Sequence, residues 1–225
     1  MASQRILLVE GESDKDFCQQ IICTLKLDII IEPETPRILC QAQSDGVDVL
    51  RKVALPFALS RLAKQQISHL GIIIDADSAA LGYGFAKRRE QIITLLAQQD
   101  YIISDSQHIP GQGEIFIHSK TGIPPVGLWI MPTHSDDGML EDLLLGNLNN
   151  STQQALLAKA DNAINSLGEL RSFKDTHLSK ARLSTLLAWQ KKPGTSAGKA
   201  YQADVFAKNS TALIAFTNWL TRVFQ

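Results

Sequence analysis

Residues 5–17 read RILLVEGESDKDF, an apolar run that leads through a glycine into a group of acids. The run over residues 6–9 is short and continuous, which is typical of a strand buried on both faces of a parallel sheet. Gly11 ends the run, and Ser13 is then the expected N-cap of a helix that reaches about Leu25. This stretch therefore predicts a strand, a tight loop and a helix in succession.

Acids follow apolar strands at three places in the sequence. Glu10 ends the first run, and Asp14 falls in the first turn of the next helix, where negative charge suits the helix dipole. A second run, 69–74, ends in two acids, and a third, 126–131, leads through a polar loop into a leucine-rich helix with two more. Ligands in open α/β sheets bind beyond the carboxyl ends of the strands, so we expect these acids to gather at one edge. They are Glu10, Asp14, Asp75, Asp77, Glu141 and Asp142.

Strand and helix patterns alternate up to about residue 148, and only helical patterns follow. Pro56 is expected to kink or divide one helix, and Ser210 is expected to cap the last one. The sequence predicts an α/β domain over residues 1–148, with a small, mainly parallel sheet flanked by helices. A helical C-terminal extension, residues 149–225, is expected to pack on it. The other predicted segments are an extended link at 28–36, a strand at 37–40, a hairpin within 101–120, and helices at 47–63, 81–96, 139–145, 153–167 and 177–190.

Composition limits the class of protein. With 225 residues, 44% of them hydrophobic, the chain can bury a sizeable core. The formal net charge of −1 does not indicate binding to nucleic acid, which strongly basic proteins favour. Local basic patches could still bind it, because a net charge does not reveal them. The cysteines Cys18, Cys23 and Cys40 fit no zinc spacing and are expected to be reduced and mostly buried. We see no signal peptide and no apolar stretch of about 18 residues, and therefore expect a cytoplasmic protein without a membrane partner.

A gathering of carboxylates indicates a metal site. Close carboxylates repel one another, and their ionised forms are stable together only when a cation neutralises them. Oxygen-only ligands favour Mg²⁺ or Mn²⁺ over zinc. Such ions stabilise charge on a phosphoryl group and activate water. The expected chemistry is therefore metal-assisted phosphoryl transfer, above all phosphodiester hydrolysis.

The same residues resemble the Toprim domain, which occurs in topoisomerases, bacterial primases and small nucleases. The resemblance rests on EG at residues 10–11, on Gly46 after the second strand, and on DAD at residues 75–77. Two features resemble the overcoming-lysogenization-defect (OLD) nucleases most: the spacing from Glu10 to Asp14, and the sequence GMLEDL at residues 138–143. The whole chain resembles a small, stand-alone bacterial Toprim family related to that branch, DUF3226.

The resemblance implies roles for these side chains. Glu10 would be a metal ligand or general acid/base, and Asp75 and Asp77 would hold the divalent ion. Lys180, or else Arg182, would stabilise the charge of the transition state. The implied ligands of two Mg²⁺ or Mn²⁺ ions are Glu10, Asp14, Asp75, Asp77, Glu141 and Asp142, with Asp136 or Asp137 as an accessory.

Simpler interpretations of these residues stay open. Each acid could instead cap a helix or face water, and the run KRR at 87–89 is expected to be a solvated helix face. Trp129, Trp189 and Trp219 lie in apolar patterns that are more typical of a core than of base stacking. Ala79 stands where Toprim domains often carry a third acid, which argues against topoisomerase-like chemistry.

Three functions follow as hypotheses. The leading one is a Mg²⁺/Mn²⁺-dependent Toprim nuclease that acts on DNA or RNA. The second is a non-catalytic Toprim module, such as a regulatory subunit, that binds nucleic acid or protein, and the near-neutral charge favours it. Primase-like nucleotidyl transfer would normally need further domains. The expected partners are nucleic acid and, in a homodimer, a second copy of the chain.

Overall fold

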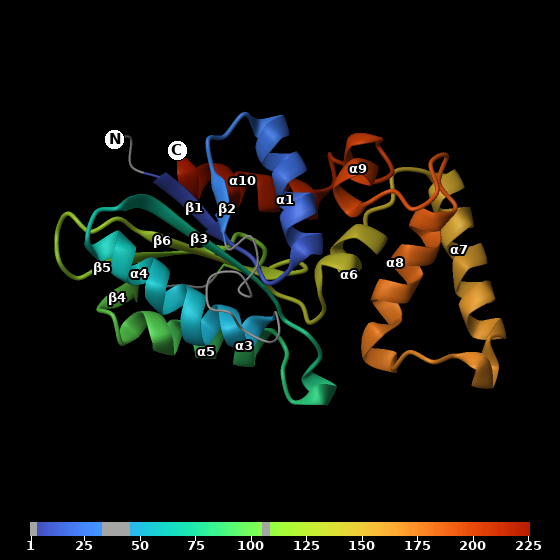
Figure 1. The fold of residues 1–225 in the computed structure, drawn as a ribbon, viewed down its shortest axis with the longest axis horizontal. Helices are drawn as coiled ribbons and strands as arrows, with labels where there is room; N and C mark the ends of the chain where they lie inside the picture. Colours follow the sequence, from blue (N-terminus) through green and yellow to red (C-terminus); the bar gives the residue numbers. More distant parts are fainter. Residues whose placement is uncertain (1–3, 33–45, 105–108) are drawn as a thin grey trace.

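The computed structural model describes residues 4–32, 46–104 and 109–225. Over these residues the chain has an α/β fold that is built on one mixed β-sheet (Figure 1). Its strands are β1 (Gln4–Leu8), β2 (Ile30–Glu32), β3 (Ile67–Asp75), β4 (Tyr101–Ile103), β5 (Glu114–His118) and β6 (Val126–Met131). They lie in the order β2-β1-β3-β6-β5-β4. The first four in this order are parallel, whereas β5 is antiparallel to both β6 and β4. The predicted mainly parallel sheet and the hairpin within residues 101–120 are confirmed.

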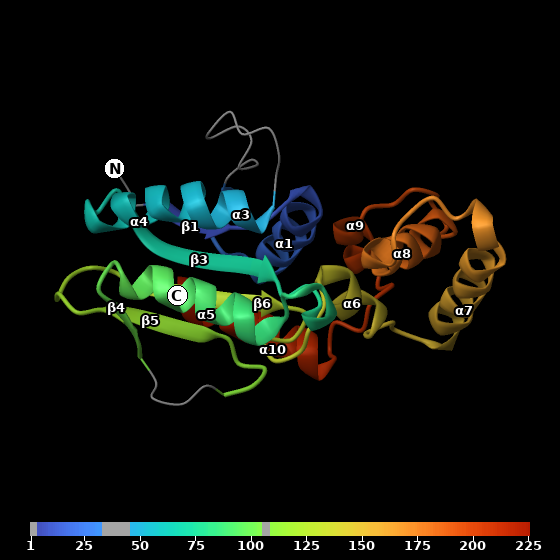
Figure 2. The same ribbon diagram turned by 90° about the horizontal axis from the view of Figure 1, so that it is seen from below.

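Helices cover both faces of this sheet (Figure 2). The main helices of the described residues are α1 (Glu12–Leu25), α3 (Val47–Val49), the π-helix η1 (Leu50–Ala54), α4 (Leu55–Ala63), α5 (Phe85–Ala97), α6 (Leu140–Leu145), α7 (Ser151–Ser166), α8 (Leu178–Ala188), α9 (Ala197–Gln202) and α10 (Thr211–Phe224). Helices α1 and α10 pack on one face, and α4 and α5 on the other. Successive strand residues point to opposite faces, so Leu7 and Val9 join one buried cluster while Ile6 and Leu8 join the other. The first apolar run is thus buried from both sides.

Helix α10 lies directly on the sheet because two strand residues have no side chain. A Cβ at Gly127 in β6 would lie 2.3 Å from Val223 Cγ2, and one at Gly71 in β3 would lie 2.9 Å from the Phe224 ring. Both distances are shorter than van der Waals contact, so a larger residue would push the helix away. The C-terminal helix therefore packs as part of the same core as the strands.

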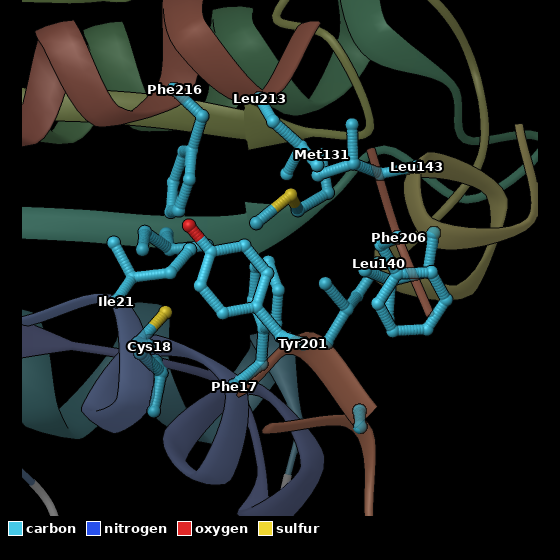
Figure 3. Close-up of a cluster of buried hydrophobic side chains, with 14 of the residues drawn as sticks. Phe17, Cys18, Ile21, Met131, Leu140, Leu143, Tyr201, Phe206, Leu213 and Phe216 are labelled. Atoms are coloured by element: carbon cyan, nitrogen blue, oxygen red, sulfur yellow. The ribbon is translucent and has the colours of Figure 1, made fainter. Parts of the chain in front are cut away.

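The C-terminal helices and the N-terminal half share one hydrophobic cluster. Figure 3 shows Phe17 and Ile21 of α1, Met131 of β6 and Tyr201 of α9 around a common interior. The ring centroids of Phe17 and Tyr201 lie 5.7 Å apart in an edge-on arrangement, and those of Phe17 and Phe216 lie 6.1 Å apart. Beyond α6, helices α7 and α8 pair with each other (Figure 1). The C-terminal part is helical, as predicted.

The two predicted N-caps have different outcomes. Helix α1 begins at Glu12, and its N-cap is Gly11, so the prediction that Ser13 caps it is wrong. Glycine is itself a favoured N-cap, and the earlier start places Ser13 inside the first turn. Ser210 caps α10 as predicted, because its hydroxyl accepts a hydrogen bond from the Leu213 N–H at 3.3 Å.

The segment between α1 and α4 differs partly from the prediction. Strand β2 pairs with β1 inside the segment predicted as an extended link. The strand predicted at 37–40 lies outside the described residues. Further on, one helical stretch runs from α3 through η1 to α4, and Pro56 follows the π-helix closely. Proline lacks the N–H that an α-helix uses, and the wider π-turn accommodates that loss without dividing the helix.

Burial agrees with most of the predictions made for single side chains. Trp129 and Trp219 are fully buried, but Trp189, the C-cap of α8, is 44% exposed, so its assignment to the core is wrong. Cys18 is buried and Cys23 is exposed, both as free thiols, and Cys40 lies outside the described residues. Across the described ranges, no helix combines the length and the apolar character that crossing a membrane requires.

Candidate functional site

Five acids line one cavity of ≈ 360 Å³. Glu12 is exposed, and the other four, Glu10, Asp14, Asp75 and Glu141, are called the cavity acids from here on. Glu10 follows β1, Asp14 lies in the first turn of α1, Asp75 ends β3, and Glu141 lies in the first turn of α6. They meet because the parallel neighbours β1 and β3 end at the same edge of the sheet. The cavity lining consists of Glu10, Gly11, Glu12, Ser13, Asp14, Gly46, Asp75, Leu140, Glu141 and Lys180.

Backbone hydrogen bonds fix two of the four carboxylates. The Asp75 N–H donates to Glu10 Oε1 at 2.8 Å, which ties the end of β1 to the end of β3. The Leu140 N–H donates to Asp75 Oδ1 at 3.1 Å, which ties the end of β3 to the start of α6. Each bond occupies one oxygen of its carboxylate. The bonds thus hold Glu10 and Asp75 in place and use a single oxygen of each.

The other two acids, Asp14 and Glu141, expose less of their surface than Glu10 and Asp75 do. Asp14 is 8% exposed and Glu141 is 7% exposed, and both line the cavity from the first turn of a helix. Lys180 of α8 lines the same cavity, and its charge acts on both acids. The ammonium group therefore offsets part of the negative charge but faces several carboxylates.

Burial raises the pKa of every acid in this group, and repulsion by other members of the group adds to the shift of Glu10, Asp14 and Asp75. Burial, followed by the charge of Asp14, raises the pKa of Glu10 to about 8. Burial, followed by the charge of Glu141, raises the pKa of Asp14 to about 7, although Lys180 opposes the shift. The pKa of Asp75 is well above its ordinary value because of burial and the three neighbouring acids, and burial raises the pKa of Glu141. Near neutral pH the group therefore retains protons that a bound cation would displace.

Asp77 does not line this cavity. Its backbone N–H donates to Gly138 O at 2.9 Å, and the Gly138 N–H donates to Asp77 O at 2.7 Å, which joins the loop after β3 to the loop before α6. The side chain forms an ion pair with Arg88 of α5. Asp77 thus stands beside the cavity, bound to a cation of the protein itself.

Asp142 and Asp137 also accept hydrogen bonds outside the cavity. Asp142 Oδ2 accepts from the Met139 N–H at 2.9 Å at the start of α6, and Asp142 Oδ1 accepts from the hydroxyl of Ser179. Asp137 accepts from the N–H groups of Ala79 and Phe85, at 2.9 and 2.8 Å. These two acids fix loops and helix ends around the cavity.

The donor set suits a hard divalent cation. The four cavity acids offer only oxygen, and their raised pKa values record a repulsion that a cation would relieve. Within the described part of the chain, no group of three or more His, Cys, Asp or Glu side chains is already arranged to hold a metal ion. Binding would therefore require the carboxylates to close around the ion.

The family of the chain follows from comparison with family models. The model described as a protein of unknown function, DUF3226, matches residues 4–225. The chain belongs to the DUF3226 family. This confirms the expected membership of DUF3226, and the match spans both the sheet and the C-terminal helices of the DUF3226 chain. Neither the curated proteins nor the solved structures gave a match.

Sequence reasoning missed Arg88 of this DUF3226 protein. The prediction that residues 87–89 form a solvated face is wrong for Arg88, which is 3% exposed, and Arg89 pairs with the buried Glu114. Lys87 is exposed, as predicted. The helical phase carried the missing signal, because Arg88 precedes Ile92 by one turn and so lies on the buried face of α5.

A second cavity of ≈ 520 Å³ adjoins the acids of the DUF3226 chain. It shares Glu141 and Lys180 with the first cavity and continues along α8 past Leu183 and Leu187 toward the residues before α9. The second cavity thus lies directly beside the first and extends away from the carboxylates along α8, as a groove next to them.

Proposed function

We propose that this protein is a Toprim-type nuclease that hydrolyses phosphodiester bonds of DNA or RNA with Mg²⁺ or Mn²⁺. The observation that carries the proposal is the convergence of Glu10, Asp14, Asp75 and Glu141 on one cavity at the carboxyl edge of a parallel sheet. Acids with mutually raised pKa values in a cavity are characteristic of functional sites, because repulsion of this kind lowers stability. The likeness of the sequence motifs to OLD-type nucleases supports the same reaction.

The four cavity acids would hold the divalent ion. The bound ion would supply positive charge to the phosphoryl oxygens and lower the pKa of water. Asp77 and Asp142 are not assigned to this ligand set, because Arg88 pairs with Asp77 and Asp142 caps α6.

Glu10 and Lys180 are the proposed catalytic side chains. In the metal-free protein, burial and the charge of Asp14 raise the pKa of Glu10 to about 8, so its carboxylate holds a proton near neutral pH until a cation displaces it. The ionised carboxylate beside the ion would then be able to accept a proton from water. Lys180 faces the same cavity, and its ammonium group would stabilise negative charge on the transferring phosphoryl group. The groove that continues along α8 provides room for the chain that flanks the scissile bond.

Metal binding and cleavage test the proposal together. We expect Mn²⁺ to raise the melting temperature of the wild type, and Asp75→Asn to abolish that response because one ligand is lost. Asp175→Asn is the matched control, since the Asp175 side chain is 84% exposed and far along the sequence from the cavity acids. Wild type and control should cleave supercoiled and single-stranded DNA, or RNA, in Mn²⁺, and Glu10→Gln should not. A wild type without a metal response, or activity unchanged in Glu10→Gln, would exclude the nuclease.

A non-catalytic Toprim module is the second candidate. It is favoured by the finding that no metal-binding group is already arranged within the described residues, and by the net charge of −1. Such a module would bind nucleic acid or a protein without cleaving phosphodiesters. Retention of labelled DNA or RNA by the protein in Mn²⁺, with no product after long incubation, would favour it over the nuclease.

A further inference from the structure

Arg88 is a buried cation at the border of the carboxylate cavity. Its side chain is 4% exposed, and its Nη2 pairs with the Asp77 carboxylate. The Tyr83 ring centroid lies 4.2 Å from the guanidinium carbon, and Nη1 donates to Gln91 Oε1 at 3.5 Å. A buried arginine needs a counter-charge, and Asp77 supplies it. Separating the pair would therefore leave a charge uncompensated inside the protein.

Asp77 is held next to Arg88 by its backbone as well. Two hydrogen bonds join it to Gly138, and its φ of 60° belongs to the left-handed region. The backbone therefore leaves only side-chain rotation as a way for the carboxylate to leave Arg88. Both residues act electrostatically on Glu10, since Asp77 raises its pKa and Arg88 lowers it. The ion pair thus borders the proposed ion site without lining the cavity.

We propose that the cavity takes a single divalent ion, and that Arg88 is a fixed cation in the position beside Asp77 that a second ion would need. This inference rests on the proposed function and limits its metal requirement to one ion. Arg88 is a positioning residue here, because it acts through Asp77. It keeps the carboxylate of Asp77 neutralised and leaves Glu10, Asp14, Asp75 and Glu141 as the ligand set.

Calorimetric titration with Mn²⁺ tests the proposal through stoichiometry, independently of activity. Wild type should bind one ion. Arg88→Met, which keeps most of the aliphatic stem, should free Asp77 and add a second ion, and the double variant with Asp77→Asn should return to one. Lys87→Met removes the same charge from the neighbouring exposed position and should leave one ion. Two ions bound to wild type, or one ion bound to a folded Arg88→Met, would overturn the inference.

Asp77→Asn alone decides the question if Arg88→Met does not fold. With Arg88 in place, Asp77 is not a ligand, so the Asn variant should bind one ion with a dissociation constant within about threefold of wild type. Loss of a site, or weakening by about tenfold or more, would contradict the inference. A wild type that binds no ion would overturn the nuclease proposal together with this one, whereas two ions in wild type would leave the nuclease standing.

Discussion

Asp14 and Glu114 are both nearly buried, at 8% and 5% exposure, yet their surroundings shift their pKa values in opposite directions. Burial and Glu141 raise the pKa of Asp14 to about 7. Burial alone would also raise that of Glu114, but His134 and Arg89 lower it to about 2. Asp14 is surrounded mainly by acids and Glu114 by bases. The sign of the neighbouring charge, rather than burial, therefore distinguishes the two regions.

The region around Glu114, His134 and Arg89, called the paired region here, holds secondary-structure elements together. Arg89 Nε donates to Glu114 Oε1 at 2.9 Å, which joins α5 to β5, and His134 Nε2 lies 3.6 Å from Glu114 Oε2. His134 Nδ1 accepts from the Ile130 N–H at 3.0 Å, which joins the same network to the end of β6. Such a network stabilises the fold, whereas the cavity acids lower stability unless a cation binds. A protein that keeps repelling acids is expected to use them.

The largest effect should come from breaking the paired region. Arg89→Met removes the arginine that pairs with the buried Glu114, and we expect it to lower the free energy of unfolding by about 2–4 kcal/mol. Urea denaturation at pH 7 measures this loss. Arg171→Met is the matched control, because the Arg171–Asp175 pair is exposed and should contribute less than about 1 kcal/mol. Equal losses of stability in the two variants would mean that burial of Glu114 adds nothing to the contribution of its pairing with Arg89.

A smaller, pH-dependent effect on stability is expected from the unpaired region, which consists of the cavity acids Glu10, Asp14, Asp75 and Glu141. The raised pKa values of Glu10 and Asp14 mean that the folded protein binds more protons than the unfolded chain between about pH 4 and pH 8. Metal-free stability is therefore highest at the acidic end of this range and falls as the pH rises toward 8. Asp14→Asn removes one repelling charge and should stabilise the metal-free protein at pH 8 by about 1–3 kcal/mol. Thermal melts in EDTA from pH 5 to pH 8 measure both the pH dependence of wild-type stability and the gain in Asp14→Asn. A wild-type stability that does not change with pH would contradict the raised pKa values of Glu10 and Asp14.

Parallel strands and the acids at their ends could be predicted from the sequence. The run at residues 6–9 is apolar throughout because both faces of β1 are covered, and this pattern identifies a buried strand without further information. Strands of this kind end at one edge, so Glu10 and Asp75 could be placed together before any coordinates were known. The prediction needed only chain direction and strand order.

The partners of the remaining acids depended on side-chain geometry that motifs do not encode. DAD at residues 75–77 suggests two equivalent ligands, yet Asp75 points into the cavity while Asp77 pairs with Arg88. Only the phase of α5 distinguishes Arg88 from the exposed Lys87 beside it. Asp142 follows Glu141 directly but serves as a cap, because neighbouring helix residues point in different directions. The position of each acid within its turn therefore decides whether its carboxylate lines the cavity or bonds to another part of the protein.

The smallest expected effect concerns Lys180, the cation within the unpaired region. Its charge lowers the pKa of Asp14 and Glu141, so it competes with a metal ion for the same carboxylates. Lys180 is exposed and partly screened by solvent, and Lys180→Met should therefore tighten Mn²⁺ binding by only about 2–5-fold at low salt. Titration calorimetry measures this, with the exposed Lys174→Met as the control. Turnover should fall in the same variant, because the proposed transition-state charge loses its lysine. Weaker binding together with lower turnover would instead mean that Lys180 positions the acids, and its electrostatic role would have to be abandoned.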